Sequence, residues 1–261
     1  MDIRDGCAPT RPAWLNYNDE HMAATPSPTV HTILAQALGR YLVLPSTSGS
    51  PAPLLVGFHG YGESAERHLE ALQGIPGVEH WRVASVQGLH RFYQTRTGQV
   101  VASWMTSQDR EQMIRDNLAY VSDVVTALRA TGDPDTPLVY AGFSQGVAMA
   151  YRAALSTKHT CRGLLALAGD IPPELHDTPS QHWPPILLGH GLNDQWYTQD
   201  KWRKDRNILK SRASRFDTVQ FDGGHEWHPD FLEAAGRFLD RIREQQIEIS
   251  AARAPADGSH A

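Results

Sequence analysis

Short apolar runs alternate with amphipathic stretches through the middle of this 261-residue chain. Runs of four to seven apolar residues suit buried strands, whereas apolar residues spaced three and four apart suit one side of a helix. Strands that alternate with helices favour an α/β fold with a mostly parallel sheet of about eight strands flanked by helices. We expect these strands at Thr32–Leu38, Arg40–Leu44, Leu54–Phe58, Arg82–Val86, Leu138–Ala141, Gly163–Ala168, Ile186–Gly189 and Thr218–Phe221.

Two of the helices can be placed from their apolar spacing. The first precedes the strand at Leu138, and Ser107 is a candidate for its N-cap. The second follows Pro229, a residue favoured in the first turn of a helix. The residues expected on the buried sides are Ile114, Leu118, Val121, Val125 and Leu128 in the first helix, and Phe231, Ala235, Phe238 and Ile242 in the second.

The composition changes near both ends of the chain. Residues 1–29 are rich in proline, alanine and polar residues without sustained periodicity, which predicts a flexible N-terminal arm. Residues 250–261 have a similar composition and predict a disordered tail. We expect one α/β domain at 30–249, and the segment between the strands ending near Ala168 and beginning near Ile186 is too short for a separate lid domain.

Charge and hydropathy exclude several classes of partner. The formal net charge is −5 and the charged residues are scattered, so we expect no nucleic-acid partner. No apolar run is long enough for membrane insertion, and the first residues lack the pattern of a secretory signal, which predicts a cytoplasmic protein. The two cysteines, Cys7 and Cys161, form no disulfide framework or metal-ligand spacing, and Cys161 is expected to be a buried small residue.

The segment Gly142-Phe143-Ser144-Gln145-Gly146 lies between a predicted strand and a strong helix-forming stretch. This pattern is typical of a nucleophile elbow, where a strained turn exposes the serine and the glycines let backbone and helix approach closely. The backbone N–H of Gln145 would then point toward an oxygen that becomes negatively charged. The alternative interpretation is that Ser144 is a small residue in a glycine-rich turn.

A second glycine-rich turn, His59-Gly60-Tyr61-Gly62, follows the strand Leu54–Phe58. Such a loop can present another backbone N–H, and we expect that of Tyr61 to complete an oxyanion hole with Gln145. His59 is then structural rather than a base. The alternative is a tight turn without a catalytic role.

A serine hydroxyl needs a base within hydrogen-bond distance, and the base needs an acid to orient it. Asp194 follows the strand at Ile186 and is the preferred acid, with Asp170 as its rival; either could instead be a turn aspartate. His225 lies in the loop before the last helix and is the expected base, while His228 is expected to cap that helix or face solvent. Although His225 and His228 are spaced like metal ligands, no third ligand is suitably placed, so we predict no metal site.

Taken together, "HGYGES", "GFSQG", "HGLND" and "GGHE", with Trp104 in "ASWM", resemble the α/β-hydrolase superfamily. Within it, the chain is similar to the phospholipase/carboxylesterase branch that includes acyl-protein thioesterases. The likeness spans most of residues 30–245. Two departures concern the pocket: Val147 stands where the family elbow usually has a second glycine, and "QWYTQ" replaces small apolar residues and proline after the acid.

The resemblance implies a serine carboxylic-ester hydrolase that forms an acyl-enzyme on small to medium acyl esters or thioesters and needs no cofactor. Ser144, His225 and Asp194 would form the triad. Phe92, Tyr93 and Trp104 could wall an acyl or aromatic pocket, or be ordinary packing. The alternatives are a peptidase or lactone hydrolase with the same triad, and a non-catalytic binding protein with the same fold.

Overall fold

The structure is a computed structural model, and it describes residues 28–49, 51–132, 135–176, 183–213 and 215–253. The chain divides into residues 1–36 and residues 37–261, and the helices and strands of the described residues lie in the second unit. Its elements are β1 (Arg40–Leu44), β2 (Leu54–Phe58), α1 (Ala65–Gln73), η1 (Val78–His80), β3 (Arg82–Gln87), β4 (His90–Tyr93), β5 (Val100–Ser103), α2 (Arg110–Ala130), β6 (Leu138–Phe143), α3 (Gln145–Ser156), β7 (Gly163–Leu167), η2 (Pro173–Leu175), β8 (Ile186–Gly191), α4 (Gln199–Arg212), β9 (Phe216–Phe221) and α5 (Pro229–Arg253).

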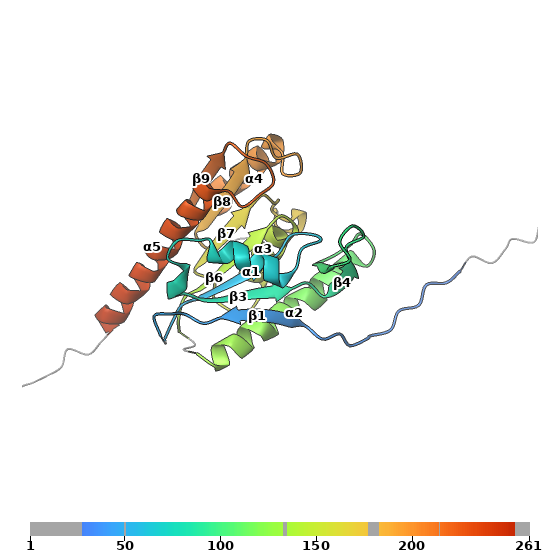
Figure 1. Ribbon diagram of the computed structural model, residues 1–261, viewed down its shortest axis with the longest axis horizontal. Coiled ribbons are helices and arrows are strands. Elements are labelled where there is room, and N and C mark those ends of the chain that lie inside the picture. Colours follow the sequence, from blue (N-terminus) through green and yellow to red (C-terminus); the bar gives the residue numbers. More distant parts are fainter. Residues whose placement is uncertain (1–27, 50, 133–134, 177–182, 214, 254–261) are drawn as a thin grey trace, which may run out of the picture. The chain divides into compact units, whose positions relative to one another are not determined.

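The described residues form a seven-stranded sheet in the order β1-β3-β2-β6-β7-β8-β9 (Figure 1). Strand β1 is antiparallel to β3, and every other neighbouring pair is parallel. Because parallel strands share one direction, the residues after β2, β6, β7, β8 and β9 meet at the same edge of the sheet. The predicted α/β fold with a mostly parallel sheet is confirmed.

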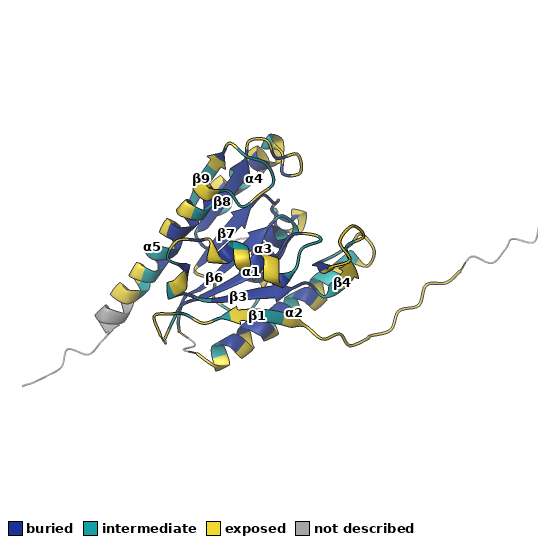
Figure 2. Cartoon of the chain, in the orientation of Figure 1, coloured by how far each residue is buried: buried dark blue, intermediate teal, exposed yellow. Residues whose placement is uncertain are grey.

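Helices cover both faces of this sheet. One apolar cluster joins it to α2, α3 and α4, and a second cluster joins it to α1 and α5. Successive side chains of β2 divide between the clusters, since Val56 belongs to the first and Leu55 to the second. The central strands are therefore buried on both sides, whereas β1 is partly exposed at the edge (Figure 2).

Three expectations about local structure were wrong. Thr32–Leu38 forms no strand, and Ile33 and Leu34 are exposed, because an apolar run becomes a strand only where a partner can pair with it. Helix α2 begins at Arg110 after Asp109, whose φ is 51°, so Ser107 does not cap it. The segment after β3, where no strand was expected, forms the hairpin of β4 and β5.

The structure does not test the domain boundaries predicted at residues 30 and 249, which stay a prediction. Helix α5 begins at Pro229, as expected, and continues to Arg253, into the predicted tail. The rest of that tail, and residues 1–27 of the predicted arm, lie outside the described residues. Within the described part of the chain, none of the helices has both the length and the apolar character needed to cross a membrane.

Candidate active site

Ser144 occupies a strained corner between β6 and α3. Its φ and ψ are 54° and −120°, a combination that non-glycine residues rarely adopt. The corner is tight because α3 approaches β2 closely: a Cβ added to Gly146 would lie 1.9 Å from the carbonyl oxygen of Phe58. The Ser144 N–H is held by Leu167 O at 3.0 Å. This is the geometry expected of a nucleophile elbow.

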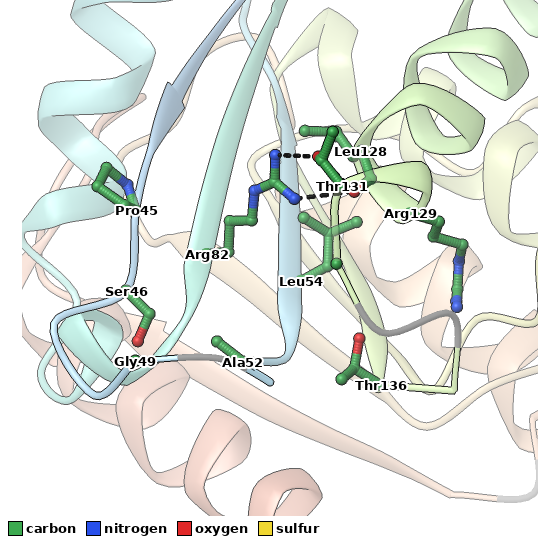
Figure 3. A pocket seen from close by; sticks show the side chains of 11 residues that line it. Pro45, Ser46, Gly49, Ala52, Leu54, Arg82, Leu128, Arg129, Thr131 and Thr136 are labelled. Atoms are coloured by element: carbon green, nitrogen blue, oxygen red, sulfur yellow. Dashed lines mark hydrogen bonds between the residues drawn. The ribbon is translucent and has the colours of Figure 1, made fainter.

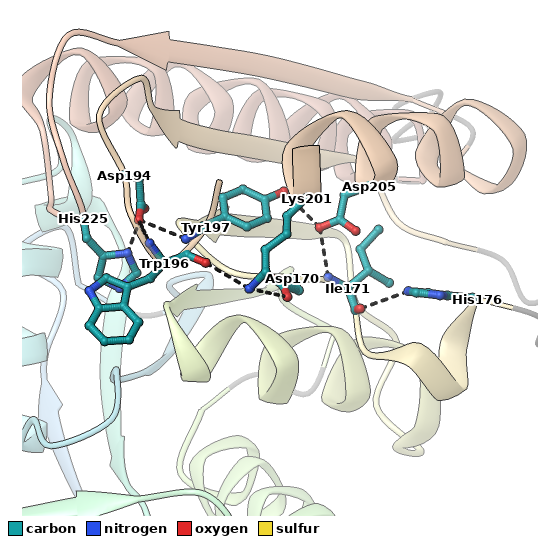
Figure 4. A network of polar contacts seen from close by, with 9 residues as sticks. All are labelled: Asp170, Ile171, His176, Asp194, Trp196, Tyr197, Lys201, Asp205 and His225. Atoms are coloured by element: carbon teal, nitrogen blue, oxygen red, sulfur yellow. Dashed lines mark hydrogen bonds and ion pairs between the residues drawn. The ribbon is translucent and has the colours of Figure 1, made fainter. Parts of the chain in front are cut away.

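Asp194 and His225 form a direct pair at the same edge of the sheet. His225 Nδ1 donates to Asp194 Oδ2 at 2.8 Å, and the Asp194 side chain is fully buried (Figure 4). The other carboxylate oxygen, Oδ1, accepts the backbone N–H groups of Trp196 at 2.8 Å and Tyr197 at 2.9 Å. These bonds fix the orientation of the carboxylate. With Nδ1 donating, Nε2 of neutral His225 is left as a proton acceptor.

Aromatic packing places His225 beside the serine corner. Its ring lies on Phe143, the residue immediately before Ser144, with 4.9 Å between ring centroids. Trp227 packs on the same Phe143 ring at 5.8 Å and so holds the loop between β9 and α5 against the end of β6. The loops after β6, β8 and β9 therefore bring Ser144, Asp194 and His225 to one rim.

The loop after β2 reaches the same corner. A Cβ added to Gly60 would lie 3.3 Å from the Cβ of Ser144, so its backbone passes next to the serine. His59 is buried, and its Nε2 accepts the Gly88 N–H at 2.9 Å while Nδ1 contacts Gly60 O at 2.7 Å. Burial lowers the pKa of His59, which keeps the imidazole neutral. His59 is a structural residue of this loop, as expected.

Gln145 connects the start of α3 to the segment after β5. Its Oε1 accepts the Trp104 N–H at 2.9 Å, and its Nε2 donates to Met105 O at 3.0 Å. Its backbone N–H belongs to the first turn of α3, where helical N–H groups lack intrahelical partners. The side chain thus ties the start of α3 to the segment after β5.

The three expected pocket residues lie in different environments. Phe92 and Tyr93 are on β4 at the surface, and Phe92 packs on the exposed ring of Tyr61 at 5.5 Å. Trp104 instead is fully buried, packs edge-on against Phe58 at 5.4 Å, and donates from Nε1 to His59 O at 2.9 Å. The expectation that Trp104 lines a pocket was therefore wrong, because the sheet and the loop after β2 enclose its side chain completely.

The remaining candidates have structural surroundings. Asp170 pairs with Lys201 Nζ at 3.1 Å, whereas Asp194 is the carboxylate that contacts His225. His228 stacks on Phe221 and accepts the Asp230 N–H at the start of α5. Cys161 is partly buried against the core, and burial raises the pKa of its thiol to about 12. Among the described residues, no three histidine, cysteine or carboxylate side chains are arranged to hold a metal ion.

Two cavities lie at opposite edges of the sheet. One of about 270 Å³ opens beside His225 and is also lined by Phe143, Trp227 and Glu63. The other, of about 180 Å³, lies where β2 and β3 begin (Figure 3). Its Arg82 guanidinium donates to Leu128 O and Thr131 Oγ1, so that arginine has a structural role. Only the first of these two cavities adjoins the Asp194–His225 pair.

Trp196 and Tyr197 were not identified as site residues from the sequence. They lie two and three residues after Asp194, yet their contribution comes through backbone N–H groups, which no side-chain motif reveals. The departure of "QWYTQ" from the family pattern was the one available indication. The sequence pattern identifies Phe143 only as part of the elbow, although its ring packs against His225.

A strained serine at a strand–helix corner, with an aspartate–histidine pair at the carboxyl edge of the same parallel sheet, defines an α/β-hydrolase. The model of the phospholipase/carboxylesterase family matches residues 41–243. The chain belongs to that family.

Individual relatives agree with this assignment. Acyl-protein thioesterase 1 of Cryptococcus neoformans var. neoformans serotype D is 32% identical over 93 residues, which are 34% of this chain and 39% of that protein. The chain therefore matches about two fifths of the length of this curated relative. Acyl-protein thioesterase 2 of Zea mays superposes with a TM-score of 0.62 at 19% identity, over 78% of this chain and 99% of that one. The carboxylesterase of Bacillus cereus superposes with a TM-score of 0.63 at 15% identity, over 79% and 95%. At these identities the two structures are evidence of the shared fold alone.

Proposed function

We propose that the protein is a serine hydrolase that cleaves small to medium carboxylic esters or thioesters through an acyl-enzyme. The observation that carries the proposal is the strained Ser144 next to the loop that holds the Asp194–His225 pair. A strained, partly exposed serine has no evident structural benefit, whereas a nucleophile requires that position. Membership of the phospholipase/carboxylesterase family supports the same chemistry.

In the proposed first step, His225 Nε2 takes the hydroxyl proton of Ser144 as the oxygen attacks the acyl carbonyl. The carbonyl π electrons move to its oxygen, which the N–H groups of Tyr61 and Gln145 stabilise. Collapse of this intermediate expels the alcohol or thiol, which receives the proton from His225. Asp194 keeps the Nδ1 proton in place and stabilises the imidazolium. Water then repeats the sequence on the acyl-enzyme and releases the acid.

Exposed aromatic rings near the site favour substrates with an apolar group. Tyr61 and Phe92 form a ring pair at the surface, and Tyr93 is exposed on the same strand as Phe92. An acyl or aryl group bound near the oxyanion loop would cover these rings and remove their apolar surface from water. A small-molecule ester as the substrate and a cytoplasmic location belong to the same proposal.

A fluorophosphonate probe tests the proposal, since it labels only an activated serine. We expect the folded wild type to be labelled and Ser144→Ala to retain the fold without labelling. A panel of nitrophenyl esters and matched thioesters with increasing acyl length then defines the preferred substrate. A folded wild type that resists the probe and leaves every ester intact would favour a non-catalytic binding protein instead.

A further inference from the structure

Asp205 is a buried carboxylate outside the triad. It lies on α4, and only 2% of the residue is exposed. One oxygen, Oδ2, accepts both the Tyr197 hydroxyl at 2.9 Å and the Ile171 N–H at 3.1 Å (Figure 4). Burying a carboxylate is unfavourable unless hydrogen bonds compensate for the lost hydration. These two bonds therefore hold their donors at defined positions.

The first donor, Tyr197, belongs to the turn that carries the triad acid. Its hydroxyl is bound by Asp205, while its backbone N–H donates to Asp194 Oδ1 at 2.9 Å. Tyr197 is buried, so water does not readily replace Asp205 as the acceptor. The position of the Tyr197 ring consequently fixes one of the two N–H groups that orient Asp194.

The second donor, Ile171, belongs to the loop after β7, which lies under the nucleophile. A Cβ added to Gly169 in this loop would lie 2.3 Å from the carbonyl oxygen of Ser144. Ala168 precedes it with φ of 57°, so the loop leaves the strand through a sharp, constrained bend. A single oxygen of Asp205 thus connects the loop under Ser144 to the turn that holds Asp194.

We propose that Asp205 is a positioning residue for the hydrolytic reaction: through Tyr197 and Ile171 it sets Asp194, and with it His225, relative to Ser144. This inference rests on the proposed serine hydrolase function. Asp205 touches no reacting atom, and its effect passes through the acid turn. An apolar residue would fill the same space but would leave the Tyr197 hydroxyl and the Ile171 N–H unpaired.

The substitution Tyr197→Phe tests the connection because it removes the hydroxyl and keeps the ring. We expect kcat for a nitrophenyl ester to fall by about ten- to a hundred-fold with little change in KM, as misplaced catalytic groups reduce the rate of chemistry rather than binding. The matched control is Tyr140→Phe, since Tyr140 is equally buried but lies on β6 and does not face the Asp205 carboxyl group. That control should leave kcat unchanged.

Substitutions of Asp205 itself separate positioning from packing. Asp205→Asn keeps an oxygen that can accept both bonds and should retain most of the wild-type kcat, whereas Asp205→Ala should lose as much as Tyr197→Phe. The low-field proton NMR resonance of the His225 Nδ1–H reports the Asp194 contact directly. It should persist in Asp205→Asn and broaden in Tyr197→Phe, both measured well below the melting temperature of each variant.

The outcomes distinguish this inference from the function on which it rests. If the fluorophosphonate labels the wild type, but Tyr197→Phe matches it in kcat and in the low-field resonance, Asp205 is not a positioning residue and the hydrolase assignment stands. Equal losses in Tyr197→Phe and Tyr140→Phe also overturn the inference, because they indicate general loosening of the core. Failure to label the wild type overturns both proposals.

Discussion

The substitution Asp205→Asn should change how the stability of the protein depends on pH. Burial raises the pKa of Asp205 from 3.8 to about 7 in the folded protein, and the hydrogen bonds from Ile171 and Tyr197 lower it only in part. Nearby Asp170 raises this pKa, Lys204 lowers it, and the buried Tyr151 also faces the carboxyl group. The folded state therefore binds the proton more tightly than the unfolded state does.

The sign and size of the effect follow from proton linkage. A raised carboxyl pKa stabilises the folded protein while the group is protonated, and that stability is lost as the pH rises toward the folded-state value near 7. Between pH 5 and pH 8 the loss for one such group is about 2 to 3 kcal/mol. Asparagine does not titrate, so the variant should lack this part of the pH dependence.

Urea unfolding of wild type and Asp205→Asn at pH 5 and at pH 8 measures the difference. Every other titrating group is common to both proteins and cancels when the two unfolding free energies are subtracted. From pH 5 to pH 8, we expect the unfolding free energy of the variant to rise by about 2 to 3 kcal/mol relative to that of the wild type. The same difference at both pH values would refute the reasoning, since Asp205 would then have equal proton affinity in the folded and unfolded states.

Two further substitutions test the construction of the site. Gly146→Ala should destabilise the protein by about 3 kcal/mol or fail to fold, because the new Cβ would meet the Phe58 carbonyl oxygen. Gly224→Ala is the control in urea unfolding, as its Cβ would meet no atom within 4 Å; similar values for both would contradict the close-approach argument. Gln145→Ala should lower the unfolding free energy by about 1 to 3 kcal/mol, because the buried Trp104 N–H loses its acceptor. Denaturation midpoints equal to those of the wild type would show that Gln145 does not hold the segment after β5.

Most of the fold could be predicted because its information is local. The strands at Arg40–Leu44 and Leu54–Phe58 were located to the residue, since their apolar runs and flanking turns are adjacent in the sequence. Thr32–Leu38 was apolar enough to be predicted as a strand, but none of the described strands pairs with it. Pairing depends on a distant segment, and the run itself contains no information about that segment.

The site residues also differ in whether local sequence is enough to predict them. Ser144 could be found because a strand, a glycine-flanked turn and a helix are consecutive, and the structure adds the strained φ that this arrangement imposes. In the structure Asp194 contacts His225 and Asp170 contacts Lys201. The preference for Asp194 over Asp170 depended on the family resemblance, because both residues follow strands that end at the same edge.

The sequence alone determined most of the strands of the main sheet, that the sheet is mostly parallel, and which chemical groups follow its strands, because these properties depend on neighbouring residues and on strand direction. Only the tertiary structure decided that Trp104 is core, that Phe143 supports His225, and that Asp205 connects two loops. Those contacts join segments that are far apart in the chain, and burial and hydrogen bonding between such segments exist only once the whole sheet has assembled.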